Sequence, residues 1–359
     1  MTSRWGLLAR QIANGTQVTS GDRVSVFLTD VHAAPAVEAF VEECSSRGAT
    51  VQVLLTDEKY DLSALRHATD EQLTTPPALE EQAMRWSTVH VSFRGMATPT
   101  GALDQRRVAL QRKGKGIISA LRWENTRWCL VRVPTREWAE LIGVPPSQLE
   151  EEFFAGCLDD WAQVDEKQHE LCDALNRSTW MQVTTPDTNL RCGTAGRTWV
   201  SFAGEMNLPD GEVATAPLDH AVEGFITFPG TFWFSGVSIT NLRLVFEAGR
   251  VVDVSADEGE EFARHMVSSD GGSDRVGELG VGTNRHVSTF TGDLLIDEKI
   301  LGTMHLALGR AYPECGGVNQ SSIHWDIVKD LRHPGASLTT DVGDLIVDGV
   351  VTGLLEPLA

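Results

Sequence analysis

The sequence predicts two domains of different fold class: an α/β domain with a parallel sheet over residues 1–177, and a mostly antiparallel, β-rich domain over residues 178–359. A chain of 359 residues is long enough for two ordinary hydrophobic cores. The first half alternates buried-strand and helical patterns, whereas the second half has short alternating strands separated by tight turns. With 42% hydrophobic and 22% charged residues, the composition is that of a soluble globular protein.

The first domain begins with a short amphipathic helical pattern over residues 4–13. Residues 23–29 then predict a buried strand, residues 34–48 a helix, and residues 50–56 a second strand. A strand, helix and strand at this spacing form a βαβ unit, which implies a parallel sheet. No glycine-rich fingerprint follows the first strand, so we do not expect a nucleotide-binding fold. Further apolar runs alternate with helical segments and continue the pattern, over residues 88–96, 116–123 and 127–135.

The longest helical stretch covers residues 146–175, and we expect it to close the first domain. Pro146 suits the first turn of a helix, and the acidic residues that follow it suit a helix start. Apolar residues recur at intervals of three and four, which is typical of a packing helix. These positions are Leu149, Phe153, Phe154, Cys157, Leu158 and Trp161.

The second domain is predicted from strand patterns over residues 225–236, 242–256, 293–309 and 344–355. The pair Asp348-Gly349 stands between apolar runs and indicates a hairpin turn. Two further hairpins are expected, at residues 247–250 and 297–298.

Charge and cysteine content exclude several classes of protein. A formal net charge of −20 argues against a nucleic-acid partner, because phosphate binding needs clustered Lys and Arg. No stretch is apolar for long enough to indicate a signal peptide or a membrane span. The six cysteines form no C-x-x-C pair or disulfide framework, so we expect reduced thiols and a cytoplasmic protein with no membrane partner.

The strongest chemical signal lies between residues 302 and 330. His324 and Asp326 are two residues apart, so in an extended strand both side chains point to the same face. Glycines in the segment between His305 and His324 would let it fold back and bring His305 to the same place. Imidazole and carboxylate ligands suit Zn, Mn, Co or Fe. A bare His-x-Asp is also compatible with a satisfied histidine beside a surface aspartate.

Two glutamates belong with these residues. Glu212 lies in LPDGEVATAP and Glu278 in VGELGVGTN, both among glycines that indicate turns. Either one alone would be an ordinary solvated loop acid. Together with two histidines and an aspartate, they form a candidate shell for one or two divalent transition-metal ions.

The order of four motifs resembles the metalloaminopeptidase family of the aminopeptidase T and S type. These motifs are GEVATAP, GELGVGTN, GTMHLALG with a tyrosine seven residues after its histidine, and SSIHWDIV. The resemblance implies an N-terminal α/β domain, a β-rich metal-binding domain, a homo-oligomer, and Tyr312 as the active-site tyrosine. It implies the metal ligands Glu212, Glu278, His305, His324 and Asp326. The segment between the two histidines is shorter than in the peptidases, which puts peptide specificity in doubt.

Enzymes of aromatic catabolism share this scaffold. A ring-cleaving dioxygenase branch has histidine in the middle motif, so Glu278 argues against it. In overall likeness and compact size the chain also resembles 5-nitroanthranilic acid aminohydrolases, which are metal-dependent deaminases. That resemblance implies deamination of an aromatic amine, 5-nitroanthranilate to 5-nitrosalicylate and ammonia. An anionic substrate needs a local cation in so acidic a protein, and Arg285 and Arg310 are the candidates. The alternative for each is an ordinary solvated arginine on the surface, with no role in binding.

The chemistry expected in either case is attack by a water that a divalent metal activates. The first alternative to deamination is an aminopeptidase that releases N-terminal residues from short peptides, with Tyr312 stabilising the oxyanion. Glu212 or Glu278 would carry protons if only one ion is bound. The second alternative is a non-catalytic binding protein with a degenerate site. The complete set of ligand types argues against it.

Overall fold

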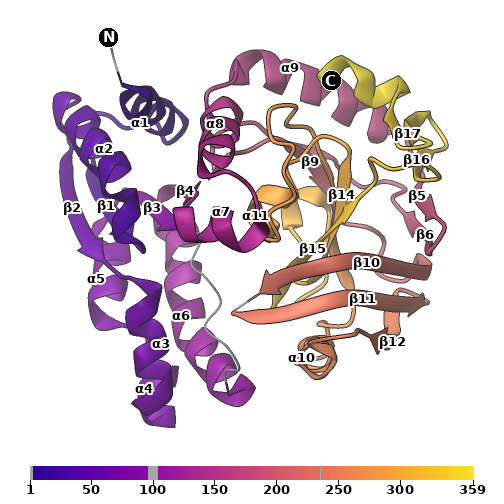
Figure 1. The fold of residues 1–359 in the computed structure, drawn as a ribbon, viewed down its shortest axis with the longest axis horizontal. Helices are drawn as coiled ribbons and strands as arrows, with labels where there is room; N and C mark the ends of the chain where they lie inside the picture. The colour runs from indigo at the N-terminus through magenta and orange to yellow at the C-terminus, as the bar shows by residue number, and fades with distance from the viewer. Residues whose placement is uncertain (1–2, 96–103, 235) are drawn as a thin grey trace. The chain divides into compact units, whose positions relative to one another are not determined.

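The computed structural model describes residues 3–95, 104–234 and 236–359, and its contacts divide the chain into two compact units. Unit 1 comprises Met1–Asp159 and Gly204–Asp210, and unit 2 comprises Asp160–Ala203 and Gly211–Ala359. Unit 1 holds a parallel sheet with helices, and unit 2 holds two antiparallel sheets (Figure 1). The predicted fold class is therefore confirmed.

The sheet of unit 1 has the strand order β2-β1-β3-β4-β8, and all its strands run parallel. Its first strands are the expected ones, because short runs rich in Val and Leu and bounded by turns favour strands. The last strand comes from the short segment that returns from unit 2. The bounds are β1 Arg23–Leu28, β2 Thr50–Leu55, β3 Val89–Gly95, β4 Arg127–Val133 and β8 Asn207–Leu208.

Helices cover both faces of this sheet. Phe27 packs with Met84 of α5 and Ile118 of α6, whereas Phe93 points to the other face and meets Phe40 of α2 at a ring distance of 5.8 Å. The helices are α1 Arg4–Gly15, α2 Ala34–Ser46, α3 Glu58–His67, α4 Asp70–Thr74, α5 Ala78–Trp86, α6 Gln105–Asn125, α7 Arg136–Ile142 and α8 Pro146–Cys157, with a 3₁₀ turn η1 at Val31–Ala33. Among the described residues, no helix has the length and apolar character that crossing a membrane requires.

Two elements of this half differ from the sequence prediction. The run at residues 116–123 belongs to α6, because its apolar residues form the buried face of a helix and not a strand. The single helix expected over residues 146–175 is two helices, α8 and α9 (Trp161–Leu175), because Asp160 caps a new helix by accepting a hydrogen bond from Gln163 N. By its contacts α9 belongs to unit 2. The domain boundary after residue 177 stays a prediction.

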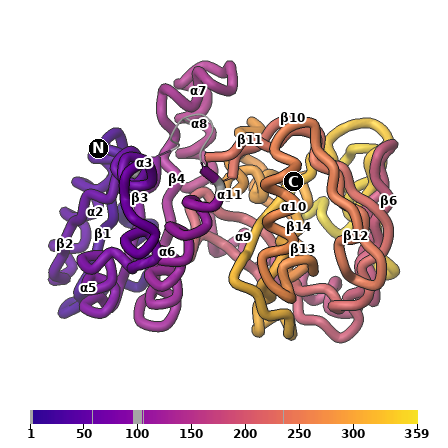
Figure 2. Tube along the Cα trace, turned by 90° about the horizontal axis from the view of Figure 1, so that it is seen from below, coloured from indigo at the N-terminus to yellow at the C-terminus, as the bar shows by residue number. Residues whose placement is uncertain are grey.

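The larger sheet of unit 2 has eight antiparallel strands in the order β12-β11-β10-β6-β5-β16-β17-β18. Figures 1 and 2 show β10 and β12 beside β11. Two predicted hairpins are confirmed, since Glu247 pairs with Arg250 and Val347 with Val350. The bounds are β5 Trp180–Thr185, β6 Thr188–Gly193, β10 Val222–Phe234, β11 Val237–Glu247, β12 Arg250–Ser255, β16 Ser337–Thr340, β17 Asp344–Val347 and β18 Val350–Val351.

The smaller sheet of unit 2 has five antiparallel strands in the order β15-β14-β13-β9-β7. Three of its strands are buried at almost every position, and their residues other than Glu212, Glu278 and His305 are apolar or small. The bounds are β7 Val200–Phe202, β9 Glu212–Thr215, β13 Val276–Gly282, β14 Thr303–Gly309 and β15 His324–Asp330.

The third predicted hairpin, at residues 297–298, is wrong. Residues Leu294–Asp297 form a helical turn, α11, in which Asp293 caps the backbone N–H of Leu295. The remaining helical segments of unit 2 are α10 Glu260–Val267, η2 Pro313–Cys315 and η3 Gly353–Leu358.

Candidate metal centre

The strand register of the smaller sheet places the predicted ligands on one face. Glu278 pairs with Ala307, which pairs in turn with Asp326, so these residues form one row across three strands. The next row holds His305 opposite Gly280, and Gly282 pairs with Glu212 one row further. Because side chains alternate along a strand, these residues all project to the same side. The pattern of glycine and acid in β13 therefore leaves space for side chains from neighbouring strands.

Gly280 shows why this space is required. A Cβ atom at residue 280 would lie 2.0 Å from Cε1 of His305, closer than any real contact. The imidazole ring thus occupies the volume that a side chain at this position would fill. The sequence analysis took the glycines around Glu212 and Glu278 as signs of turns, which is wrong, since both glutamates stand in strands and Gly280 serves close packing.

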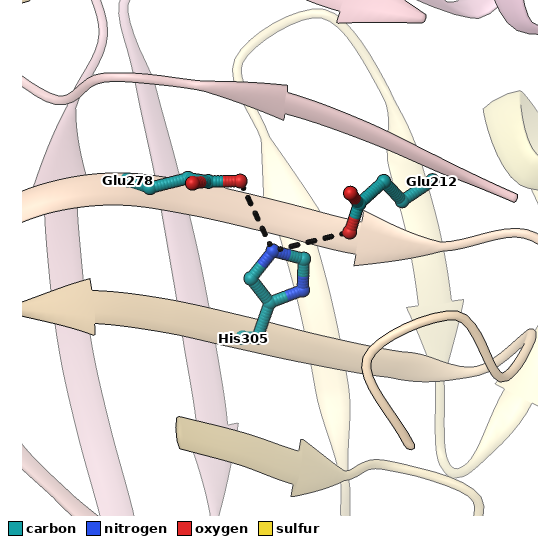
Figure 3. A group of neighbouring side chains, drawn as sticks. All are labelled: Glu212, Glu278 and His305. Carbon is teal, nitrogen blue, oxygen red and sulfur yellow. Dashed lines mark hydrogen bonds and ion pairs between the residues drawn. The ribbon is translucent and has the colours of Figure 1, made fainter. Parts of the chain in front are cut away.

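Glu278 lies between the two histidines. Its Oε1 is 3.4 Å from Nε2 of His305, and its Oε2 is 3.0 Å from Nε2 of His324. His305 Nε2 is also 3.4 Å from Oε2 of Glu212, so the imidazole stands between two carboxylates (Figure 3). Glu212, Glu278 and His305 are at most 5% exposed. The structure therefore brings these three predicted ligands together at a buried point.

His324 and Asp326 complete the predicted set. His324 Nε2 is 3.4 Å from Oδ1 of Asp326, as expected for residues two apart on one strand. His324 Nδ1 lies 2.9 Å from the carbonyl oxygen of Arg310, an acceptor, so this nitrogen carries the proton and Nε2 faces the carboxylates. Tyr312 Oη is 3.5 Å from the same Nε2. The tyrosine predicted for the active site thus stands beside the ligands.

The pKa values of the residues at the centre are shifted by burial and by the clustered carboxylates. Burial lowers the pKa of His305, but hydrogen bonding to Glu278 and the charges of Glu212 and Glu298 outweigh it and raise that pKa to about 9. The pKa of Glu278 is lowered, because hydrogen bonds from His305 and His324 outweigh its burial. Burial raises the pKa of Tyr312, which keeps its hydroxyl protonated as a donor. The neighbouring carboxylates therefore favour the protonated forms of His305 and His324.

Two residues of the centre were missed by the sequence analysis. Glu298 stands within reach of His305 and Asp326, so that one ligand atom of each lies within 4.8 Å of the others. Lys299, which is fully buried, approaches Glu298 Oε1 at 2.8 Å and Glu212 Oε1 at 2.5 Å. Both follow α11 in a segment outside the strands, and neither has a spacing to the ligands that a motif would reveal.

The two predicted substrate-binding arginines differ in their surroundings. Arg310 is exposed, and its carbonyl oxygen lies 2.9 Å from Nδ1 of His324, which places this residue near the centre. Arg285 is exposed, and its Nε lies 3.3 Å from Nε2 of His286. Substrate binding by either arginine stays a prediction.

The donor set fits divalent transition metals. Three groups of residues each place one ligand atom per residue within 4.8 Å of the others in the group, and some residues belong to two groups. The groups are Glu212, Glu278 and His305; Glu278, His324 and Asp326; and Glu298, His305 and Asp326. Each group combines imidazole nitrogen with carboxylate oxygen, the donors that Zn, Mn, Co and Fe accept. Glu278 contributes one oxygen toward each histidine, which suits a carboxylate shared by two ions. The role of each residue as a ligand stays a prediction.

Known proteins of similar sequence cover almost the whole chain. It is 26% identical over 382 residues to aminopeptidase 2 of Geobacillus stearothermophilus, which covers 91% of this chain and 89% of that protein. It is 26% identical over 393 residues to aminopeptidase T of Thermus thermophilus, with 95% and 94% covered.

Solved structures show the same fold. Wild-type AmpT from Thermus thermophilus superposes with a TM-score of 0.82 at 24% identity, covering 98% of this chain and 99% of that one. The 2,5-dihydroxypyridine dioxygenase from Pseudomonas putida KT2440 superposes with a TM-score of 0.59 at 13% identity, covering 98% of each chain. The sequence of residues 7–340 matches that of a protein family described as thermophilic metalloprotease (M29). The chain belongs to this family of metal-dependent hydrolases.

Proposed function

We propose that this protein is a metal-dependent aminopeptidase that removes N-terminal residues from short peptides. The observation that carries the proposal is the group of Glu212, Glu278, His305, His324 and Asp326 on one face of one sheet, with Tyr312 beside it. The relatives named above, which are called aminopeptidases, support the same activity. The metalloprotease family implies divalent metal ions, and we propose that these residues hold one or two of them.

The side chains suit this reaction. A bound divalent cation supplies Lewis acidity, which polarises a carbonyl group and lowers the pKa of water. The surplus of carboxylates would attract the α-ammonium group of a peptide. Tyr312 stays protonated because burial raises its pKa, so its hydroxyl would donate a hydrogen bond to the oxyanion that forms from the peptide carbonyl. Glu298 is a further candidate to accept and return a proton, since burial raises its pKa.

The comparisons favour this activity over the deamination that the compact chain suggested. The named relatives are aminopeptidases, and none of those cited is a deaminase. Deamination of 5-nitroanthranilate keeps one supporting observation, the position of the exposed Arg310 near Tyr312, where it would meet a substrate carboxylate. We retain deamination as the second candidate for that reason.

One experiment separates the two candidates. Protein loaded in turn with Mn²⁺, Zn²⁺, Co²⁺ and Fe²⁺ is incubated with leucine p-nitroanilide and, separately, with 5-nitroanthranilate. Release of nitroaniline is followed by absorbance, and release of ammonia by an enzymatic assay. We expect hydrolysis of the anilide with at least one metal. Ammonia release from 5-nitroanthranilate without anilide hydrolysis would reject the aminopeptidase.

We also propose that the protein is a homo-oligomer. Strands β12 and β18 are the outer strands of the larger sheet, and Val252 and Val350 on them are 52% and 65% exposed. An exposed apolar edge strand favours pairing with a second copy. Light scattering at micromolar concentration should give a multiple of 39.2 kDa, and a value equal to that mass would reject this proposal.

A further inference from the structure

Lys299 is an unusual residue for the interior of a protein. It is 0% exposed and is among the largest fully buried side chains described. A buried ammonium group is costly unless it is paired and hydrogen-bonded. Here its Nζ donates to Glu212 Oε1 at 2.5 Å and lies 2.8 Å from Glu298 Oε1. One lysine therefore joins two of the carboxylates that surround His305.

The backbone around Lys299 is held by hydrogen bonds to Asn284, two residues after the end of β13. The N–H of Asn284 donates to the carbonyl oxygen of Lys299 at 2.8 Å, and the N–H of Leu301 donates back to Asn284 at 3.0 Å. A Cβ atom at Gly282 would lie 2.2 Å from the carbonyl oxygen of Ile300, so the glycine lets β13 lie directly against this segment. The ammonium group thus projects from a held backbone and not from a loose turn.

The contacts of Glu212 show what this lysine does. Lys299 Nζ donates a hydrogen bond to Oε1 of Glu212. The other carboxylate oxygen, Oε2, lies 3.4 Å from His305 Nε2. A carboxylate held by one oxygen presents the other in a set direction, as outer hydrogen-bond partners of metal ligands do. Lys299 also separates the charges of Glu212 and Glu298, which would otherwise repel each other.

We infer that Lys299 is a positioning residue of the proposed metal centre: it orients Glu212 toward His305. The inference rests on the proposed function, because it requires that these residues hold a metal ion. Without the ammonium group Glu212 would lose its orientation, so metal affinity should fall.

The test compares two buried lysines of unit 2. Co²⁺ is titrated into chelator-stripped wild-type protein, Lys299→Met and Lys329→Met, and the d–d absorption gives both affinity and coordination geometry. Lys329 is a matched control, because it is 1% exposed and its Nζ contacts the oxygens of Asp187 and Thr227 at 3.2 and 2.6 Å. It lies three residues from Asp326 on β15, so its side chain points to the opposite face.

We expect Lys299→Met to weaken Co²⁺ binding by ten- to a hundredfold and to change the absorption spectrum. Lys329→Met should lower the melting temperature but keep the wild-type spectrum and an affinity within about twofold. If Lys299→Met does not fold, Lys299→Gln, which keeps one donor group, is measured with the same expectation. Wild-type affinity and spectrum in the folded Lys299 variant, or tighter binding, would overturn the inference. Absence of Co²⁺ binding by the wild-type protein would instead reject the proposed metal centre.

Discussion

Buried carboxylates are treated differently in the two units. In unit 1, Asp22 accepts hydrogen bonds from Arg127 at 2.6 Å, from the Thr88 hydroxyl at 2.7 Å and from the Thr19 N–H at 2.8 Å. One arginine balances one carboxylate. In unit 2, the described ion pairs join a single lysine to two of four clustered carboxylates, Glu212, Glu278, Glu298 and Asp326.

The difference shows how a structure can indicate a binding site for cations. A carboxylate with its own partner, such as Asp22, stabilises the fold and requires nothing further. Carboxylates that exceed their cations are costly to bury, and here protons on His305 and His324 offset part of that cost. Divalent ions at this point would supply the remaining positive charge. The following predictions test this contrast, beginning with the largest effect.

Removal of a ligand should have the largest effect. His305→Ala or Asp326→Ala should reduce metal-dependent hydrolysis by more than the ten- to hundredfold that loss of an outer contact costs. Asp326→Ala should keep the fold, because it removes one of the clustered carboxylates, and His305→Ala is interpreted only where it is shown to fold. Activity on leucine p-nitroanilide and bound metal are measured together, with circular dichroism as the control for folding. Full activity with unchanged metal content would remove either residue from the ligand set.

Gly280→Ala should be nearly as damaging, although it removes no ligand. The added methyl group would meet the His305 ring at 2.0 Å, and a ring held between buried strands has little room to move. We expect at least a tenfold loss of metal affinity, on the scale seen when the partners that orient ligands are lost. Gly271→Ala is the matched control, since a Cβ atom there meets nothing within 4 Å. Equal metal affinities in the two variants would show that the space at Gly280 is not required.

Asp22→Asn should affect stability and leave activity unchanged. Burial raises the pKa of Asp22, but hydrogen bonds from Thr19, Thr88 and Arg127 outweigh it and lower that pKa to about 2. A lowered pKa contributes stability that is present above the unfolded-state value of about 4 and is lost as the pH falls to about 2. Wild type should therefore melt above the variant at pH 7, and the gap should close toward pH 2. A gap independent of pH would mean that the charge of Asp22 is not what stabilises unit 1.

The smallest effect is expected from the two arginines. For a neutral aminoacyl anilide, Arg310→Ala and Arg285→Ala should change kcat/KM by less than about twofold, because exposed charges interact weakly with a neutral group. If 5-nitroanthranilate is turned over, loss of the arginine that pairs with its carboxylate should lower kcat/KM at least tenfold, about 1.4 kcal/mol. Steady-state kinetics on both substrates decides the matter. No loss with either variant would identify both arginines as surface residues.

The fold class and the clustering of the five candidate ligands could be predicted from the sequence. The strand register that brings these residues together could not. Period-two alternation placed His324 and Asp326 on one face, and motif order linked them to Glu212, Glu278 and His305. The strand register that aligns these residues across four strands is a tertiary property, so their glycines were mistaken for turns. Glu298 and Lys299 were missed because their proximity depends on how the segment after α11 lies against β13.

The surplus of carboxylates at one buried point is the central claim, and metal binding tests it most directly. Chelator-stripped protein is dialysed against Co²⁺, Mn²⁺ or Zn²⁺, and the bound metal is measured by mass spectrometry for wild type and His305→Ala. We predict at least one equivalent of metal in the wild type, a rise in melting temperature on binding, and loss of both in the variant. A folded wild-type protein that binds no metal, or a variant that binds as much, would contradict this account.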